Sequence, residues 1–434
     1  MYQTSMSGRS ESIGRLVDAL IGKMHNVRVP FGGRYMIQFR DREHEAGLFL
    51  REVLRYSGLG FIYGPYGAGK TTFLSTMAQV INSINQPAGI LMAYMNLTRD
   101  AIQAELPRGL ISRRDEIVSK LEGMVRVNVP IGPSPGSISI DLGQVLDAAR
   151  YIIKAILDKY RNSTSDIENL VIIYDGLDDF LKERVGVNSY IILSTKASFF
   201  ANSLENPSRD LWGELTGKAK KILFAVSDQA AMKVAETLIS KAKALTTPYL
   251  FWSLPKAAFE CVVKDVADLT GASSDIDVKL LWNLMGGNVR ELEYLALRYG
   301  WVVDKWLRAR VVDFLTGFMS NEELNWLIES GQRVMRTELK RDEQFVGQPD
   351  AVALNDLYVE QNPLLRRLFE LNILLRVNIP MTEPLSELPS EPWIGEHYAY
   401  QLPAYYWALR AMIEGRKVNV EAGSILKAIE ENVK

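Results

Sequence analysis

The first 255 residues alternate between short apolar runs and longer stretches with helical spacing. The apolar runs are continuous and do not alternate with polar residues, a pattern typical of parallel strands that are buried on both faces of a sheet. Helical spacing is clearest at 39–56, 70–83 and 141–160. We therefore predict an α/β domain with a parallel sheet, whose strands lie at 59–63, 89–97, 169–180, 220–228 and 248–254.

From residue 256 the pattern becomes mainly helical. Helices continue to about residue 372 and are followed by two strand-like segments, 373–379 and 397–402, on either side of a proline-rich stretch. Helices followed by a two-stranded hairpin suggest a winged helix. We predict four parts, which are an N-terminal arm (1–38), a core (39–255), a helical lid (256–302) and a C-terminal winged-helix-like domain (303–434).

Composition and charge exclude several classes of protein. Of the 434 residues, 47% are apolar and 24% are charged, as in ordinary soluble domains, and the formal net charge is −2. A chain this close to neutral is not a sequence-blind binder of nucleic acid or anionic membranes. It has no apolar run of bilayer-spanning length and no apolar segment of the signal-peptide kind at its N-terminus. We expect a cytoplasmic protein that does not enter a membrane.

The most specific motif directly follows the first predicted strand. Residues 64–72 read GPYGAGKTT, which matches the P-loop pattern of a glycine, four variable residues, and then glycine, lysine and threonine. The glycines let backbone N–H groups curl around phosphates, and the helix that follows presents its positive N-terminus to the anion. We predict that ATP and Mg²⁺ bind here, at Gly64, Pro65, Tyr66, Gly67, Ala68, Gly69, Lys70, Thr71 and Thr72. Lys70 would reach the outer phosphates, and the Thr71 hydroxyl would bind Mg²⁺.

Other polar residues stand at the ends of predicted strands. Asp175 ends an apolar run, where a second Mg²⁺ ligand is expected. Asp178 and Asp179 follow in the same loop, and one of them would orient the attacking water, although the residues alone do not say which. Ser227 and Asn96 each close an apolar strand, so Ser227 could sense the γ-phosphate and Asn96 could position the catalytic acid. Each could equally begin an ordinary turn.

The lid contains a further motif, GGNVREL, at 286–292. Asn288 and Glu291 have the spacing of a capping box, so a helix is expected to begin there. Arg290 then lies in the first turn, where the helix dipole disfavours a cation unless an anion is near. A nucleotide phosphate would be such an anion, and an ion pair with Glu291 or Glu293 on the surface is the alternative.

Four segments together resemble the archaeal P-loop ATPases at the border of the AAA+ and STAND classes, which are related to origin-recognition initiator ATPases. The segments are FRDRE (39–43), GPYGAGKTT (64–72), DGLDD (175–179) and GGNVREL (286–292). The resemblance covers about residues 39–302, and a C-terminal winged helix typical of the family would account for most of the rest. It implies ATP hydrolysis that drives a conformational switch.

The resemblance also implies a role for each matching residue. Asp175 would be the Walker B carboxylate, and Asp178 or Asp179 the hydrolytic acid. Asn96 resembles the polar switch residue and Ser227 resembles sensor 1. Arg290 would be sensor 2, while Phe39 and Arg42 would line the adenine side.

The chain departs from the family pattern in four ways. Gly176 stands where AAA+ proteins usually place an acid, and Val289 replaces the usual proline of sensor 2. Asp228 stands beside sensor 1, where STAND proteins often carry an arginine. No arginine finger is evident, which puts hydrolysis activated by a neighbouring subunit in doubt.

Two kinds of partner remain open for the C-terminal domain. A winged helix and the initiator-like FRDRE segment favour double-stranded DNA, as in a replication, mobile-element or segregation ATPase. However, residues 303–434 contain 15 basic and 20 acidic residues, and this excess of acidic charge favours a protein partner and a STAND-like regulatory role. A homo-oligomer is also possible. The aromatic residues of 397–412 are expected to be core rather than a platform for stacking bases.

Overall fold

The computed structural model describes most of the predicted core strands, the lid and the end of the C-terminal domain. The described residues are 14–53, 58–84, 90–96, 103–125, 151–152, 155, 169–176, 219–227, 246–272, 276–325, 328, 368–379, 381–395 and 398–432. No helix among them is both long and apolar enough to cross a membrane.

A seven-stranded sheet forms the core, in the order β10-β8-β3-β7-β6-β4-β5. Every neighbouring pair is parallel except β4 and β5, which are antiparallel. The strands are β3 (Gly58–Tyr63), β4 (Ile90–Asn96), β5 (Gln103–Glu105), β6 (Asn169–Asp175), β7 (Ala219–Val226), β8 (Thr246–Leu250) and β10 (Glu383–Pro384). The sequence prediction of a parallel sheet with five main strands is confirmed. β6 and β8 are shorter than expected and end at Asp175 and Leu250.

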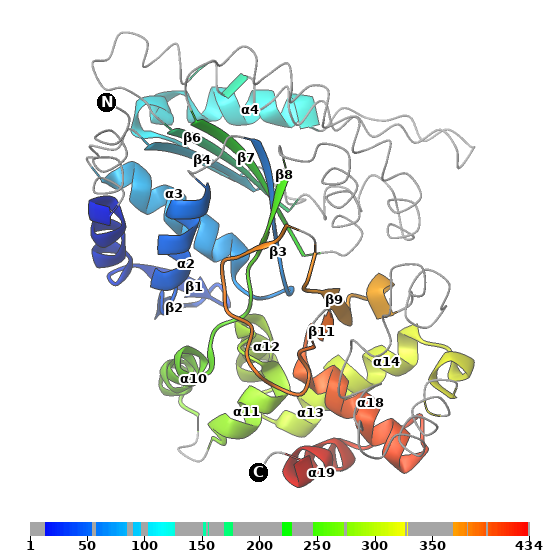
Figure 1. Ribbon diagram of the computed structural model, residues 1–434. Coiled ribbons are helices and arrows are strands. Elements are labelled where there is room, and N and C mark those ends of the chain that lie inside the picture. Colours follow the sequence, from blue (N-terminus) through cyan, green and yellow to red (C-terminus); the bar gives the residue numbers. More distant parts are fainter. Residues whose placement is uncertain are drawn as a thin grey trace.

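Helices cover both faces of this sheet (Figure 1). One face carries α2 (Glu43–Leu48), the π-helical turn η1 (Phe49–Val53) and α3 (Lys70–Ser83), which has the bounds that the sequence predicts. The 3₁₀ turn η2 (Arg108–Arg113) and α4 (Arg114–Val125) follow β5, and α4 lies on the opposite face. Because both faces are covered, the strands β3 and β6 are buried along their whole length.

The predicted N-terminal arm contains a β-hairpin. β1 (Arg28–Phe31) and β2 (Tyr35–Gln38) pair antiparallel, after a helix at residues 14–24. Leu16 and Leu20 of that helix pack into the core of the sheet domain, whereas Phe31 and Ile37 of the hairpin pack into the apolar core of the lid. The hairpin therefore joins the two parts of the molecule.

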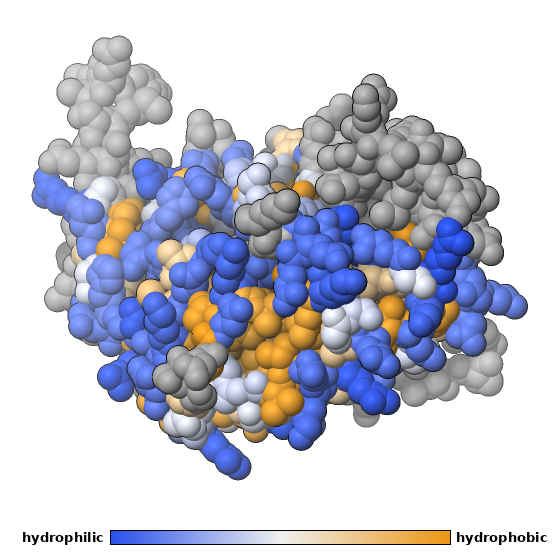
Figure 2. Space-filling view, turned by 90° about the horizontal axis from the view of Figure 1, so that it is seen from below, coloured by the Kyte–Doolittle hydropathy of each residue, from blue (hydrophilic) through white to orange (hydrophobic). Residues whose placement is uncertain are grey.

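The lid and the C-terminal part share one continuous apolar core. Trp282, Trp306, Trp393 and Trp407 are all fully buried in it. The lid consists of α10 (Lys256–Thr270), α11 (Val278–Met285), α12 (Val289–Glu293) and η3 (Tyr294–Arg298). The C-terminal part continues with α13 (Val303–Leu307), η4 (Arg308–Val312), α14 (Asp313–Phe318), β9 (Leu374–Arg376), β11 (Tyr398–Tyr400), α18 (Pro403–Gly415) and α19 (Ala422–Asn432). On its outer side this region is mainly hydrophilic, with apolar side chains gathered near the centre (Figure 2).

The two strands of the predicted C-terminal hairpin pair with each other, but the segment that connects them is not the exposed loop expected of a winged helix. β9 and β11 pair antiparallel, and Tyr398, Tyr400, Tyr406 and Trp407 are core residues, as expected. Part of the proline-rich connection turns back to the sheet domain, where β10 pairs with β8 as an additional parallel strand. The stretch 329–367, which would supply the other helices of a winged helix, lies outside the described residues, so the winged helix remains a prediction.

Candidate nucleotide-binding site

The loop between β3 and α3, which we call the P-loop (residues 64–72), depends on glycine at two close approaches. Gly64 and Gly67 both have positive φ, 157° and 82°. A Cβ atom on Gly64 would overlap the carbonyl oxygen of Phe251, and one on Gly67 would overlap the Asn288 side chain. Glycine therefore lets the P-loop pass between the end of β8 on one side and the lid on the other.

Lys70 opens helix α3 and points into the curve of the P-loop. Its side chain is buried, and its Nζ donates to the carbonyl oxygens of Gly64 (2.9 Å) and Pro65 (2.8 Å). The ammonium group thus lies at the N-terminus of α3, next to the backbone N–H groups of the first helical turn. This combination of a lysine and a helix N-terminus suits a polyphosphate.

Asp175 lies at the end of β6, close to the P-loop, and is almost completely buried. Burial raises the pKa of Asp175, whereas hydrogen bonds from Thr71 and Tyr94 and the charge of Lys70 act to lower it. A buried carboxylate beside a threonine hydroxyl provides the hard oxygen donors that Mg²⁺ prefers. Thr71 and Asp175 therefore fit the Mg²⁺ site that the sequence predicts.

Tyr94 is a contact of Asp175 that the sequence analysis missed. Its hydroxyl donates to Asp175 Oδ2 at 2.8 Å, and burial next to this carboxylate raises the pKa of Tyr94 far above its usual value. Tyr94 stands two residues before Asn96 on β4, so both side chains point to the same face of the sheet. Side chains two positions apart on a strand lie on the same face, so the position of Tyr94 two residues before Asn96 is the sequence signal that could have identified Tyr94.

Asn96 and Ser227 lie where the sequence predicts, at the ends of β4 and directly after β7. Asn96 pairs in register with Asp175. Both Asn96 and Ser227 line the cleft that also contains the P-loop and Asp175. Asp178, Asp179 and Asp228 lie outside the described residues.

The cleft has a volume of about 470 Å³ and runs from the P-loop to the hairpin β1–β2. A pocket of this size is typical of small-molecule and cofactor sites. The end beyond the P-loop is mainly apolar, which suits a flat base better than a phosphate. The apolar residues there are Val29, Pro30, Phe31, Ile37, Phe39, Leu254, Val262 and Val289. Phe39 was predicted on this side, whereas the contribution of β1–β2 was not.

Arg42 lines the same cleft, but its guanidinium forms hydrogen bonds with other groups of the protein. Its Nη2 donates to the carbonyl oxygens of Ala68 (2.8 Å) and Trp252 (3.0 Å), and its Nη1 donates to Glu45 Oε1 at 2.6 Å. The side chain is only 3% exposed, and the guanidinium carbon lies 4.3 Å from the centre of the Phe251 ring. In this structure the Arg42 guanidinium therefore contacts the P-loop backbone at Ala68 and three residues outside the P-loop, and its predicted contact with adenine stays a prediction.

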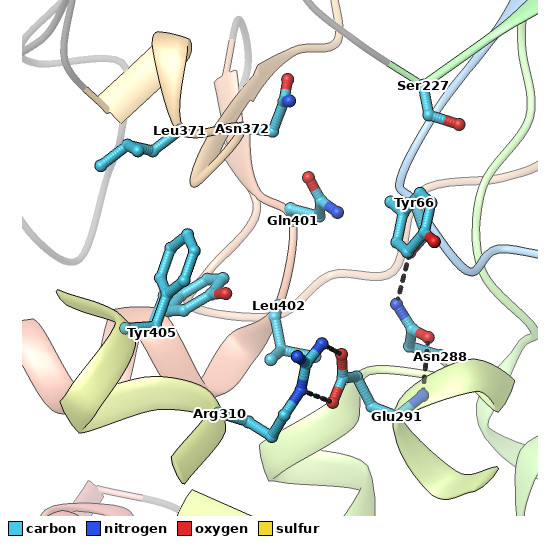
Figure 3. Close-up of a pocket in the computed structure, with 11 residues that line it drawn as sticks. Tyr66, Ser227, Asn288, Glu291, Arg310, Leu371, Asn372, Gln401, Leu402 and Tyr405 are labelled. Atoms are coloured by element: carbon cyan, nitrogen blue, oxygen red, sulfur yellow. Dashed lines mark hydrogen bonds and ion pairs between the residues drawn. The ribbon is translucent and has the colours of Figure 1, made fainter. Parts of the chain in front are cut away.

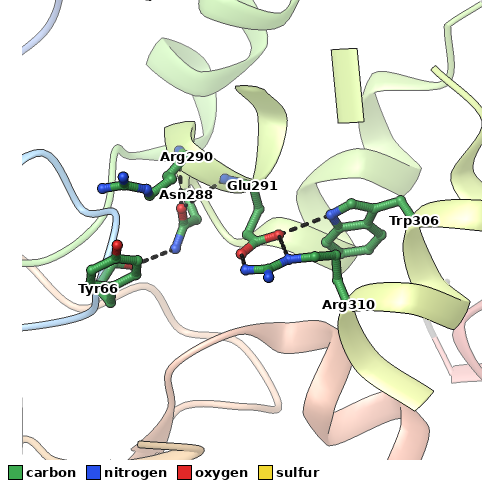
Figure 4. A network of polar contacts seen from close by, with 6 residues as sticks. All are labelled: Tyr66, Asn288, Arg290, Glu291, Trp306 and Arg310. Carbon is green, nitrogen blue, oxygen red and sulfur yellow. Dashed lines mark hydrogen bonds and ion pairs between the residues drawn. The ribbon is translucent and has the colours of Figure 1, made fainter. Parts of the chain in front are cut away.

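The lid contacts the P-loop through Asn288 and Arg290 (Figure 4). Asn288 caps α12 by accepting from the backbone N–H groups of Arg290 and Glu291, and its Nδ2 donates to the Tyr66 carbonyl oxygen at 2.7 Å. The Arg290 guanidinium carbon lies 4.8 Å from the centre of the Tyr66 ring. Arg290 also lines the nucleotide cleft together with Lys70, so the predicted sensor 2 residue faces the candidate phosphate site.

The predicted capping box is only half formed. Asn288 is the N-cap, but the Glu291 carboxylate turns away from it and binds Arg310 through two hydrogen bonds, of 2.6 and 3.2 Å. It also accepts from Trp306 Nε1 at 2.9 Å. Pairing with a nearby arginine is the stronger interaction for a buried carboxylate, and it ties the lid to η4 of the C-terminal part.

A smaller pocket of about 220 Å³ lies on the other side of Tyr66 (Figure 3). Tyr66 and Ser227 line both this pocket and the larger cleft, and Asn288 lines the smaller pocket. Gln401, directly after β11, reaches it from the C-terminal part. With its amide oriented to satisfy both neighbours, Gln401 accepts from the Tyr66 backbone N–H (3.2 Å) and donates to the Asn372 carbonyl (2.5 Å). The C-terminal part thus also contacts the P-loop.

The Tyr94–Asp175 hydrogen bond leads to a pH-dependent prediction. If Asp175 holds Mg²⁺, as the sequence predicts, it must be ionised. The Tyr94 hydroxyl stabilises the ionised form, so Tyr94→Phe should raise the pKa of Asp175. We expect the acidic limb of Mg²⁺-dependent nucleotide binding to move to higher pH, with binding at pH 6 weakened about two- to tenfold. Binding of a fluorescent nucleotide measured from pH 5 to 8 checks this. Tyr249→Phe, which removes a hydroxyl from β8 far from Asp175, is the control, and an equal shift in both variants would contradict the assignment.

Comparisons with known proteins give structural neighbours only. No protein-family model matches the chain, and no curated protein matches its sequence. Among solved structures it is similar to the ADP form of the Aeropyrum pernix ORC2 protein, with 17% identity over 79% of this chain and 88% of that one, and a TM-score of 0.37. The same ORC2 protein with ADPNP and ADP gives 15% identity over 78% and 88%, with a TM-score of 0.33. The Aeropyrum pernix ORC1 protein in complex with DNA gives 11% identity over 90% and 92%, with a TM-score of 0.31. At such low identities, the chemistry of the site has to be inferred from its own geometry.

Proposed function

We propose that this protein binds ATP with Mg²⁺ and hydrolyses it, and that the lid and the C-terminal part respond to the bound nucleotide. One observation carries the proposal, namely the convergence of the P-loop, Lys70 and the Thr71–Asp175 pair at one end of a cleft whose other end is mainly apolar. Phosphates need the first end and a base suits the second.

In this proposal each group has a separate task. Backbone N–H groups of the P-loop and the Lys70 ammonium hold the β- and γ-phosphates, where negative charge increases during phosphoryl transfer. Thr71 and Asp175 hold Mg²⁺, which would neutralise charge on the phosphate oxygens. Asp178 or Asp179 would orient the attacking water, and Asn96 and Ser227 would contact the acid and the γ-phosphate. This sharing of tasks by positioned charges is how phosphoryl transfer is generally catalysed.

Contacts at Tyr66 support a switch function. The lid holds the Tyr66 carbonyl through Asn288 and the ring through Arg290, and the C-terminal part holds its N–H through Gln401. A phosphate that draws the Arg290 guanidinium into the cleft would weaken its contact with the Tyr66 ring. Nucleotide binding would then shift the equilibrium between two positions of the lid. The size of the shift would equal the difference in nucleotide affinity between the two positions.

Lys70→Ala tests the nucleotide site itself. Loss of a buried cation that contacts phosphates should weaken ATP binding by at least about 30-fold, and hydrolysis should disappear with it. Isothermal titration calorimetry with Mg·ATP measures the first effect and phosphate release measures the second. Lys264→Ala, which removes an exposed lysine of the lid, is the matched control. Normal ATP binding by Lys70→Ala would refute the site.

Arg290→Ala tests the proposed sensor. If Arg290 contacts the γ-phosphate mainly during the reaction, kcat should fall about 10- to 100-fold while KM changes less than about threefold. Arg298→Ala, which removes an exposed arginine from η3, should leave both constants unchanged. Equal losses in binding and hydrolysis by Arg290→Ala would count against a sensor role.

We further propose double-stranded DNA as the target of the C-terminal part, with a protein partner as the alternative. The β9–β11 pair followed by α18 supports the first, and the acidic excess of residues 303–434 supports the second. The sequence offers two groups of basic residues for phosphate contact. Arg376 of the first group lies on β9, whereas the others lie outside the described residues, namely Arg366 and Arg367 of the first group and Arg333, Arg336, Lys340 and Arg341 of the second.

Salt dependence separates the two targets. A protein that contacts DNA phosphates should lose affinity steeply as salt rises from about 50 to 200 mM, because it releases counterions on binding. Fluorescence anisotropy with a labelled duplex, with and without ATP, checks this. Absence of salt-dependent binding at the lower salt would eliminate DNA and leave the protein partner.

A further inference from the structure

A segment of the C-terminal part completes the core sheet. This segment, which we call the strap (residues 381–386), contains β10 and lies beside β8 (Figure 1). The backbone N–H groups of Leu385 and Ser386 both donate to the Leu250 carbonyl, at 2.8 and 3.2 Å. Leu385 is fully buried in the core of the sheet domain. The strap thus covers the edge of β8 and is held by both hydrogen bonds and apolar contact.

A buried chain of hydrogen bonds leads from the strap to the P-loop. Ser386 Oγ donates to Glu45 Oε1 at 3.1 Å, and the same oxygen accepts from Arg42 Nη1 at 2.6 Å. Arg42 Nη2 then donates to the Ala68 carbonyl at 2.8 Å. All four residues are at most 5% exposed. The chain therefore connects two segments more than 300 positions apart in the sequence without passing through solvent.

The geometry gives Arg42 little freedom. Its guanidinium is planar, lies over the Phe251 ring and reaches two carbonyl oxygens with one nitrogen, so its position follows that of Glu45. Burial lowers the pKa of Arg42, while the charge of Glu45 acts to raise it. A buried ion pair of this kind adds little net stability but fixes orientation when its remaining hydrogen bonds are made, and Ser386 makes one of them.

Ordinary sheet packing does not require this chain. Edge coverage is achieved by the β10 backbone and Leu385, and Tyr63 binds the same region separately by donating to the Val377 carbonyl at 3.0 Å and contacting Thr382 Oγ1 at 3.1 Å. The Ser386 hydroxyl serves a different contact, with the carboxylate that pairs with Arg42, the arginine that binds the Ala68 carbonyl of the P-loop.

We propose that Glu45 and Ser386 are positioning residues, through which docking of the strap fixes Arg42 and holds the P-loop in its nucleotide-binding conformation. The proposal rests on the proposed function of that loop. Because coupling between two sites is reciprocal, nucleotide binding tightens strap docking by the same factor by which docking tightens nucleotide binding. A partner that draws the C-terminal part away from the sheet would then lower nucleotide affinity.

The test compares two strap variants of the full-length chain. Ser386→Ala breaks the chain to Arg42, whereas Thr382→Val removes a strap hydroxyl that does not lead to Arg42. We expect Ser386→Ala to raise the Kd of Mg·ADP about three- to tenfold, which corresponds to the net contribution of a typical single hydrogen bond. Thr382→Val should stay within about twofold, and Ser386→Thr, which keeps a hydroxyl, should restore part of the affinity.

Hydrogen exchange provides a second measurement that needs no nucleotide. In the absence of ligand, P-loop amides of Ser386→Ala should exchange faster than those of the unsubstituted chain, while Thr382→Val should not change them. In the unsubstituted chain, Mg·ADP should slow exchange of the Leu385 and Ser386 amides. These results together support the positioning role.

Two results would overturn it. The first is unchanged P-loop exchange and unchanged Mg·ADP affinity in Ser386→Ala, and the second is an equal loss in Ser386→Ala and Thr382→Val. If the unsubstituted chain fails to bind Mg·ADP, the proposed function fails, and exchange of the P-loop amides in Ser386→Ala still decides whether the strap positions the loop.

Discussion

The alignment of the parallel strands is the constraint on which the site depends. Tyr63 of β3 pairs in register with Val226 of β7, Asp175 of β6 pairs with Ala225, and Asn96 of β4 pairs with Asp175. The strands β3, β7, β6 and β4 therefore end within one residue of each other in register. The residues at or just beyond these ends lie together at one edge of the sheet. A shift of one residue in any of these pairings would turn the site side chains to the other face of the sheet.

Burial then gives these side chains their properties. Lys70 and Asp175 are each at most 5% exposed, so their charges are screened far less than they would be in water. Lys70 donates to two P-loop carbonyls at 2.9 and 2.8 Å, and Asp175 accepts from Tyr94 at 2.8 Å and also from Thr71. The opposite charges of Lys70 and Asp175 are close together and shielded from water. Such a pair suits a polyphosphate and a divalent cation, as we propose.

The P-loop is also the place where three parts of the chain meet. The lid contacts it through Asn288, the C-terminal part contacts it through Gln401, and Arg42 joins it to the sheet domain. Since the lid and the C-terminal part share one apolar core, a movement of either involves the other. The fold thus connects the state of a small loop with a large part of the molecule, as a nucleotide-dependent switch requires.

Local patterns in the sequence determined the secondary structure of the core and the residues of the P-loop. Continuous apolar runs fixed the main strands, and the spacing of glycines with Lys70 and Thr71 located α3 to the residue, because these signals depend only on neighbouring positions. Contacts between distant segments were decided by the tertiary structure alone. The period of two along β4 places Tyr94 on the same face as Asn96, but only the folded structure brings its hydroxyl to Asp175. The sequence has no local signal for Glu291 turned toward Arg310, or for a proline-rich segment that adds a strand beside β8. The partner of a buried polar side chain, and the segment that covers an open sheet edge, are set by how distant parts of the chain pack together. Neighbouring positions in the sequence do not contain that information.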